Sequence, residues 1–113
     1  MGNTSAPTQL GIVATGAGRM VFGTFAMSAS YATDGDTVPG GPASLGVNSL
    51  DVLWVKSQNS GWIALWNGGK STVKVQFRGQ QPSTATSGVL VLDQVASATD
   101  LSAVTVDYIA FGR

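Results

Sequence analysis

Hydrophobic and polar positions alternate most clearly between residues 49 and 78, which predicts three β-strands joined by two tight turns. The expected strands are 49–57, 62–66 and 71–78. The turns contain Asn-Gly and Gly-Gly pairs, which supply the positive φ angles that hairpins need. The segment also holds all three tryptophans of the chain. It therefore predicts an antiparallel meander with aromatic side chains on both faces.

The turn between the second and third strands decides which face of the meander is buried. A two-residue turn at Asn67-Gly68 or at Gly68-Gly69 gives the same faces, because the two registers differ by two residues. The expected core face carries Leu53, Val55, Trp62, Ala64, Trp66, Val73 and Val75. The opposite face carries Leu50, Val52, Trp54, Ile63 and Leu65 beside Lys74 and Gln76. A three-residue turn with a bulge would swap the faces and expose Trp62 and Trp66.

The second face of the meander is too apolar for free solvent and too polar for a core. A surface of this kind is often covered by another chain. We therefore expect Val52, Trp54, Ile63 and Leu65 to contact a subunit or partner.

Four further strands are predicted outside the meander, at 10–15, 19–28, 88–94 and 103–111. The first is expected at a sheet edge. The second is apolar on both sides, as in a strand covered on two faces, and Gly23 in its middle indicates a bulge or a close backbone approach. In the last, Val106, Tyr108 and Ala110 share one face.

The connecting segments complete the prediction. Residues 31–48 form a long Gly/Pro-rich loop, and its Pro39, Pro42 and Leu45 are candidate contact residues. Residues 79–87 form a polar loop, and 97–102 a helical turn capped by Thr99 or Asp100. About seven strands and no long helix predict an all-β, antiparallel β-sandwich or barrel, jelly-roll-like, as one domain over 10–113 after a flexible N-terminal arm, 1–9.

Composition narrows the function classes. The 113-residue chain has formal net charge zero and only 11% charged residues, so we expect no nucleic-acid partner. No apolar run reaches the ~20 residues of a membrane helix, and the N-terminus lacks the basic region of a signal peptide. Cysteine and histidine are absent, which removes thiolate and histidine metal sites and most nucleophile–base pairs. We expect no cofactor, no metal and no catalytic residue.

Three motifs suggest chemistry but have simpler structural interpretations. Asp34-Gly35-Asp36 could offer oxygen ligands to calcium, yet the spacing of an EF-hand is missing and turn residues are favoured. Six aspartates permit a hydrolytic carboxylate pair, but no spacing selects one. Trp54, Trp62 and Trp66 could stack on a sugar, although core and interface packing is favoured.

The chain resembles small virion proteins of tailed bacteriophages. The resemblance is carried by Tyr31-Ala32-Thr33-Asp34-Gly35-Asp36-Thr37, by Leu45-Gly46 leading into Leu50-Asp51-Val52-Leu53-Trp54-Val55, by Ala98-Thr99-Asp100-Leu101-Ser102-Ala103-Val104 and by Ile109-Ala110-Phe111-Gly112-Arg113. It implies a head decoration (capsid cement) protein, made in the host bacterial cytoplasm, that binds the major capsid protein as a homotrimer in the virion. The alternatives are a tail or fibre component, or a carbohydrate-binding module that uses surface tryptophans.

Overall fold

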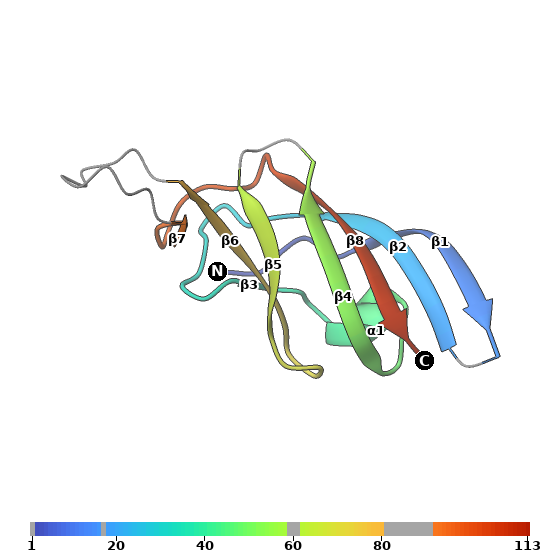
Figure 1. Cartoon of the computed structure of the whole chain (residues 1–113). Helices are drawn as coiled ribbons and strands as arrows, with labels where there is room; N and C mark the ends of the chain where they lie inside the picture. Colours follow the sequence, from blue (N-terminus) through green and yellow to red (C-terminus); the bar gives the residue numbers. More distant parts are fainter. Residues whose placement is uncertain (1, 17, 59–61, 81–91) are drawn as a thin grey trace.

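The computed structural model describes residues 2–16, 18–58, 62–80 and 92–113, and these residues form eight strands and one short helix. Two sheets are present, and all pairs between their strands are antiparallel (Figure 1). The predicted all-β antiparallel class without a long helix is confirmed. Within the described ranges, no helix is long and apolar enough to cross a membrane.

The larger sheet has the strand order β1-β2-β8-β4. Its strands are β1 (Thr8–Thr15), β2 (Gly18–Ala26), β8 (Thr105–Gly112) and β4 (Leu50–Ser57). The predicted edge strand at 10–15 is confirmed, because β1 lies at the end of this order. The last strand of the chain, β8, is central and pairs with both β2 and β4.

The smaller sheet has the order β3-β6-β5, and β7 pairs with the far end of β6. Its strands are β3 (Asp36–Thr37), β6 (Val73–Gln80), β5 (Ile63–Gly68) and β7 (Leu92–Gln94). The two-residue β3 lies in the segment predicted to be only a loop. Residues 88–91 of the predicted strand, 81–87 of the polar loop and 59–61 of the first turn lie outside the described residues.

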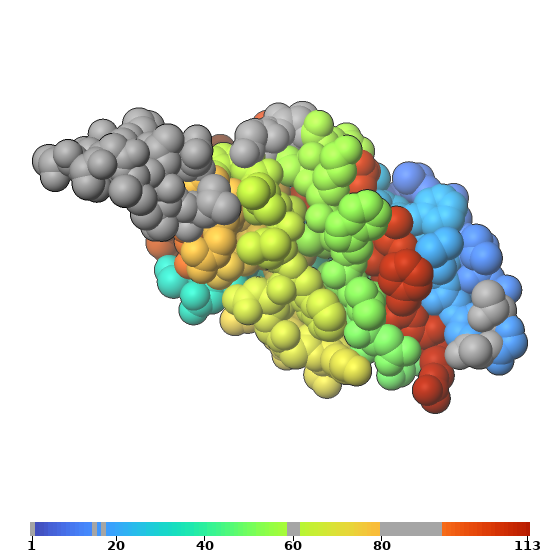
Figure 2. All heavy atoms as spheres, viewed as in Figure 1, coloured from blue at the N-terminus to red at the C-terminus, as the bar shows by residue number. Residues whose placement is uncertain are grey.

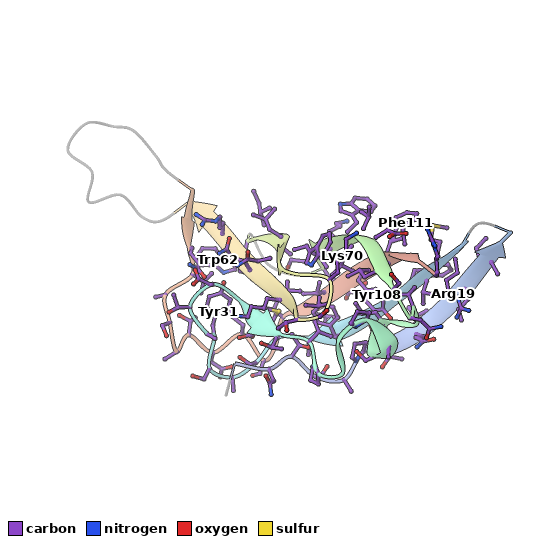
Figure 3. The ribbon with its side chains drawn as sticks, turned by 90° about the horizontal axis from the view of Figure 1, so that it is seen from below. Arg19, Tyr31, Trp62, Lys70, Tyr108 and Phe111 are labelled. Atoms are coloured by element: carbon purple, nitrogen blue, oxygen red, sulfur yellow. The ribbon has the colours of Figure 1, made fainter. Side chains whose placement is uncertain are left out.

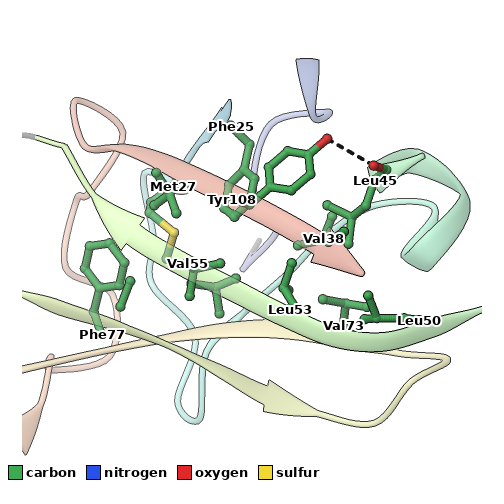
Figure 4. Packing of buried hydrophobic residues seen from close by; sticks show 14 of the residues in the cluster. Phe25, Met27, Val38, Leu45, Leu50, Leu53, Val55, Val73, Phe77 and Tyr108 are labelled. Carbon is green, nitrogen blue, oxygen red and sulfur yellow. Dashed lines mark hydrogen bonds between the residues drawn. The ribbon is translucent and has the colours of Figure 1, made fainter. Parts of the chain in front are cut away.

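One apolar core joins the two sheets. The alternation of each strand turns every second side chain inward. The buried cluster includes Val21, Phe25, Val106, Tyr108 and Ala110 from the larger sheet and Ala64, Val73, Val75 and Phe77 from the smaller one. Figure 4 shows part of this cluster, with Phe25 and Tyr108 from the larger sheet and Val73 and Phe77 from the smaller one. The Tyr108 ring stacks on the Phe25 ring with centroids 5.9 Å apart. The Tyr108 hydroxyl donates a hydrogen bond to the Leu45 carbonyl oxygen, 3.2 Å away.

The three strands predicted as one meander are divided between the two sheets, because β4 pairs with β8 and β5 pairs with β6. Their faces are as predicted, although the turn between β5 and β6 is not. Gly68 pairs with Val73, so residues 69–72 make a four-residue connection in place of the expected two-residue turn. The pairing moves by an even number of residues, and each side chain therefore keeps its face. Leu50 is the exception, because the β4–β8 register shifts between Leu50 and Val52 and Leu50 becomes fully buried.

The long loop after β2 contains a helix that the sequence pattern did not predict. Helix α1 (Gly41–Leu45) has glycine caps at Gly40 and Gly46, both with positive φ. Leu45 is consequently turned into the core, where it is fully buried. The prediction that Leu45 contacts a partner is therefore wrong, while Pro39 and Pro42 remain half-buried at the surface.

The helical turn predicted at 97–102 is absent, and two tight turns occupy this stretch. The Thr99 hydroxyl donates to the Ala96 carbonyl oxygen, and the Asp100 carboxylate accepts bonds from the backbone and hydroxyl of Ser102. Such local bonds compete with the bonds of a helix. They also lower the pKa of Asp100, because the Ser102 hydroxyl and backbone N–H stabilise its charged form.

Residues 2–5 of the predicted N-terminal arm, 1–9, are hydrogen-bonded to the rest of the fold. Thr4 is buried, its N–H donates to the Thr37 carbonyl oxygen at 2.9 Å, and the Thr37 N–H donates to Gly2 at 2.7 Å. The Ser5 N–H donates to the Ala26 carbonyl oxygen at 2.8 Å. These residues satisfy backbone groups at the ends of β2 and β3.

Replacing Gly23 with alanine is expected to lower the free energy of unfolding by about 1–3 kcal/mol, because a buried site would be overpacked. A Cβ at Gly23 would collide with the Thr8 carbonyl oxygen and the Tyr108 ring. The predicted close backbone approach is thus confirmed. Urea denaturation of Gly23→Ala measures the cost. Gly16→Ala is the control, since no described atom lies within 4 Å of its Cβ position; equal midpoints for both variants would contradict the prediction.

Candidate contact surface

The outward face of the larger sheet carries two apolar rows that run across all four strands. The strand registers place the members of each row side by side. The rows are Val13, Met20, Phe111 and Val52, and then Gly11, Phe22, Ile109 and Trp54. Phe111 and Tyr108 come from opposite faces of β8, one outward and one in the core (Figure 3). The larger sheet therefore presents an apolar surface on the side away from its core.

Most side chains of these rows are exposed, while Met20 and Ile109 are half-buried. Trp54 is 62% exposed and Val52 50%, while Phe22 and Phe111 are each 40% exposed. Trp54 and Val52 are therefore on the surface, as the alternation predicted. The sequence predicted that the strand at 19–28 is covered on both faces, but the exposure of Phe22 shows that the outer face of β2 is partly open. Contiguous apolar patches of this kind mark interaction sites.

Strand β5 extends the apolar surface beyond β4. Ile63 is 47% and Leu65 is 42% exposed, and both point away from the core that Ala64 enters. In Figure 2, β5 (yellow-green) lies beside β4 (green), followed by β8 (red) and β2 (blue). We call this set the outer apolar surface; it comprises Val13, Phe22, Val52, Trp54, Ile63, Leu65 and Phe111.

Charged and polar groups border this surface. The next row across the larger sheet is Thr8, Thr24, Asp107 and Lys56. Gln58 Nε2 donates a hydrogen bond to Asp107 Oδ1 at 2.6 Å. Near the opposite end, Lys70 Nζ lies 3.9 Å from Asp51 Oδ1 in an exposed ion pair. An apolar centre with a polar rim is the common anatomy of a protein interface.

Two shallow hollows lie in or beside the outer apolar surface. One is lined by Val13, Gly18, Arg19, Met20, Asp51, Phe111 and Gly112. The other is lined by Trp54, Val55, Lys56, Asp107, Tyr108 and Ile109. Each combines apolar walls with a charged side chain, so each could receive an apolar side chain of a partner and orient it.

The three tryptophans do not form one platform. Trp54 faces outward, whereas Trp62 and Trp66 are half-buried and pack against the core. Trp62 lies over Gly79, where a Cβ would meet its ring. The structure therefore brings one exposed indole to the surface, which weakens the idea of a sugar-stacking platform.

Asp34 lies in the loop before β3 and Asp36 is the first residue of β3, and the two carboxylates do not share a site. Asp36 is fully buried, and its two carboxylate oxygens accept hydrogen bonds from the Ser28 N–H at 2.9 Å and the Ala32 N–H at 3.0 Å. Asp34 is exposed and has a positive φ of 71°. No group of three potential metal-ligating side chains occurs among the described residues. Asp36 thus acts as an anchor for backbone N–H groups.

Two tyrosines use their hydroxyl groups to join separate elements. Tyr31 donates to Gln94 Oε1 of β7 at 2.9 Å and accepts from the Phe77 N–H of β6 at 3.0 Å. Tyr108 joins β8 to α1 through Leu45, as described above. Burial raises the pKa of both tyrosines above 10.0, so both hydroxyls stay protonated at neutral pH. These polar groups are structural.

No protein-family model matches the chain, and no curated protein or solved structure matches it either. A functional proposal therefore depends on the outer apolar surface and on the sequence resemblance given above.

Proposed function

We propose that this chain is a non-enzymatic structural protein of a tailed-phage virion, a decoration protein that binds the outside of the head. Its partner would be the major capsid protein of the same phage. The observation that supports this proposal is the outer apolar surface, which crosses β1, β2, β8, β4 and β5 and has a polar border. A protein whose task is contact needs such a surface.

The charge of the chain is consistent with this role. Formal net charge is zero, so many copies can gather on one particle without strong mutual repulsion. The resemblance adds the kind of particle, through residues 31–37 and 98–104 in particular. These residues include Asp36 and Asp100, which organise turns. The resemblance thus concerns features that build the fold.

The energetics of such a contact can be estimated. A stable interface buries about 800 Å² on each partner, which is about one-eighth of this chain's 6160 Å². Apolar burial contributes about 25 cal/mol per Å², and association costs of roughly 4–15 kcal/mol are then subtracted. A contact of this size could hold neighbouring capsomers together. The stabilisation of the shell would increase with the number of bound copies.

Replacing Trp54 with aspartate is expected to weaken binding to empty shells by about 30-fold or more, because a central aromatic residue often contributes at least 2 kcal/mol to binding. Trp54 is the most exposed aromatic side chain of the outer apolar surface, so the variant should still fold. Co-sedimentation with shells assembled from the major capsid protein measures the affinity.

Thr33→Asp is the matched control, because Thr33 is exposed in the loop before β3. It adds the same charge away from the outer apolar surface and should bind like the unmodified chain. Equal binding by Trp54→Asp and Thr33→Asp would contradict the proposal. A change of tryptophan fluorescence on adding sugars, lost in Trp54→Phe, would instead support a glycan-binding tail or fibre component.

A further inference from the structure

Strand β1 is held by backbone pairing with β2, and none of its side chains from Thr8 to Ala14 is buried. Every residue from Thr8 to Ala14 is exposed except Gly11, which is half-buried. Leu10, Ile12 and Val13 are 65%, 53% and 47% exposed. Figure 1 shows β1 (blue) at one end of the molecule, on the far side of β2. Three large apolar side chains are therefore placed where they contribute little to their own core.

The outer edge of β1 also offers backbone groups for pairing. Within the described part of the chain, β1 pairs with β2 and with no other strand. Sheet edges are usually protected by charged residues, prolines or bulges. β1 has the sequence TQLGIVAT, without charge or proline, and its single irregularity is a register shift between Gln9 and Gly11. From Gly11 to Thr15 the edge is regular and open.

We propose that β1 pairs with β1 of a second copy of this chain, antiparallel and across a two-fold axis. The free N–H and C=O groups of an edge require an extended strand as partner. A second copy meets this need without placing like charges together, since neither β1 carries a charge. Apolar side chains on both faces of β1 would then lie beside those of the second copy and lose part of their exposure.

The geometry fixes the register of this pair. The two-fold axis is perpendicular to the sheet, and residues directly opposite one another must lie on the same face. The axis therefore passes midway between the two copies of one residue. The regular stretch that pairs with β2 from Gly11 to Thr15 is centred on Val13. With Val13 on the axis, Ile12 of each copy lies opposite Ala14 of the other, so a large side chain meets a small one.

This pairing has a consequence for the outer apolar surface. Val13 belongs to that surface, and a two-fold axis perpendicular to the sheet makes the surfaces of both copies continuous. The dimer does not depend on the proposed capsid role and would form in its absence. It also differs from the three-fold association that the sequence resemblance implies, which would need another contact.

The test is the mass of the protein in solution, measured by light scattering from micromolar to millimolar concentration. The unmodified chain should be a dimer that dissociates on dilution. Ile12→Lys should raise the dissociation constant about tenfold or more, because charged residues on an edge oppose pairing and the two lysines would be close. Ile12 is exposed, and an unchanged circular dichroism spectrum will show that the variant folds.

Two controls separate the edge from other surfaces. Thr33→Lys adds the same charge in the exposed loop before β3, and Trp54→Asp alters the outer apolar surface. Both should dimerise like the unmodified chain. A monomer at all concentrations, a trimer, or a dimer that persists in Ile12→Lys or is lost in Trp54→Asp would overturn the proposal. A monomer would direct attention to a strand of another protein.

A disulfide test examines the register independently. The chain has no cysteine, so Val13→Cys would hold its only thiol. Directly opposite residues of antiparallel strands have Cα atoms about 4.5–5.5 Å apart, which suits a disulfide. Mild oxidation should give a covalent dimer of Val13→Cys and none of Thr33→Cys. A cross-link equally efficient in both variants would overturn this register.

Discussion

Replacing Asp36 with alanine is expected to lower the free energy of unfolding by about 3 kcal/mol, because hydrogen bonds to a charged group contribute about 1.5 kcal/mol or more each. The buried carboxylate accepts bonds from the Ser28 and Ala32 N–H groups. Its removal leaves both donors without an acceptor and releases the loop that leads into β3. Urea denaturation followed by circular dichroism measures the change.

Asp51→Ala provides the matched control for Asp36→Ala. Asp51 is exposed and forms one ion pair with Lys70 at 3.9 Å, so its removal should cost no more than about 0.5 kcal/mol. The loss of unfolding free energy in Asp36→Asn should lie between those of Asp36→Ala and Asp51→Ala, because asparagine keeps the side-chain volume and one acceptor oxygen. Equal midpoints for Asp36→Ala and Asp51→Ala would show that the buried carboxylate does not stabilise the fold.

Replacing Tyr108 with alanine is expected to lower the free energy of unfolding by about 3–5 kcal/mol, because it removes a large buried side chain and leaves a cavity. The ring stacks on Phe25 and lies against Gly23, and the hydroxyl reaches the Leu45 carbonyl oxygen. Several elements therefore lose contacts at once. Chemical denaturation is again the measurement, with the slope of the transition as a check on two-state behaviour.

Tyr108→Phe separates the contribution of the hydroxyl from that of the ring. It keeps the aromatic packing and removes one hydrogen bond, so it should cost about 1 kcal/mol. The difference between the alanine and phenylalanine variants then reports the ring. Equal losses of unfolding free energy in both variants would show that the packing of Tyr108 against Phe25 does not stabilise the core.

The alternation of residues 49–78 was enough to predict which face most side chains share, although the turn between β5 and β6 was wrong. Side chains repeat every two residues along a strand, so a register error of an even number leaves the faces unchanged. Leu50 is the exception to this rule, because the register shift between Leu50 and Val52 turns the Leu50 side chain to the other face. A bulge is set by both strands of a pair, and the pattern of one strand cannot predict it.

The contact surface could be predicted only in part. Val52, Trp54, Ile63 and Leu65 were found from the second face of the meander. The same surface includes Val13, Phe22 and Phe111, because β1, β2 and β8 lie in one sheet with β4. The alternation within a strand does not predict the order of strands in a sheet. Helix α1 escaped prediction because five residues are too few to show a helical period.

The central place of β8 in the larger sheet has a consequence for the order of folding. Arg19 pairs with Gly112 and Leu50 pairs with the same residue, so β8 joins segments that are far apart along the chain. During synthesis, β1 and β2 can form a hairpin early, but β4 has no neighbour in its sheet until residues 105–112 have emerged. Long-range pairing of this kind makes folding slow. A nascent chain would therefore keep the backbone groups of β4 that face β8 unpaired until β8 arrives, and unpaired strand edges make such a species prone to aggregation.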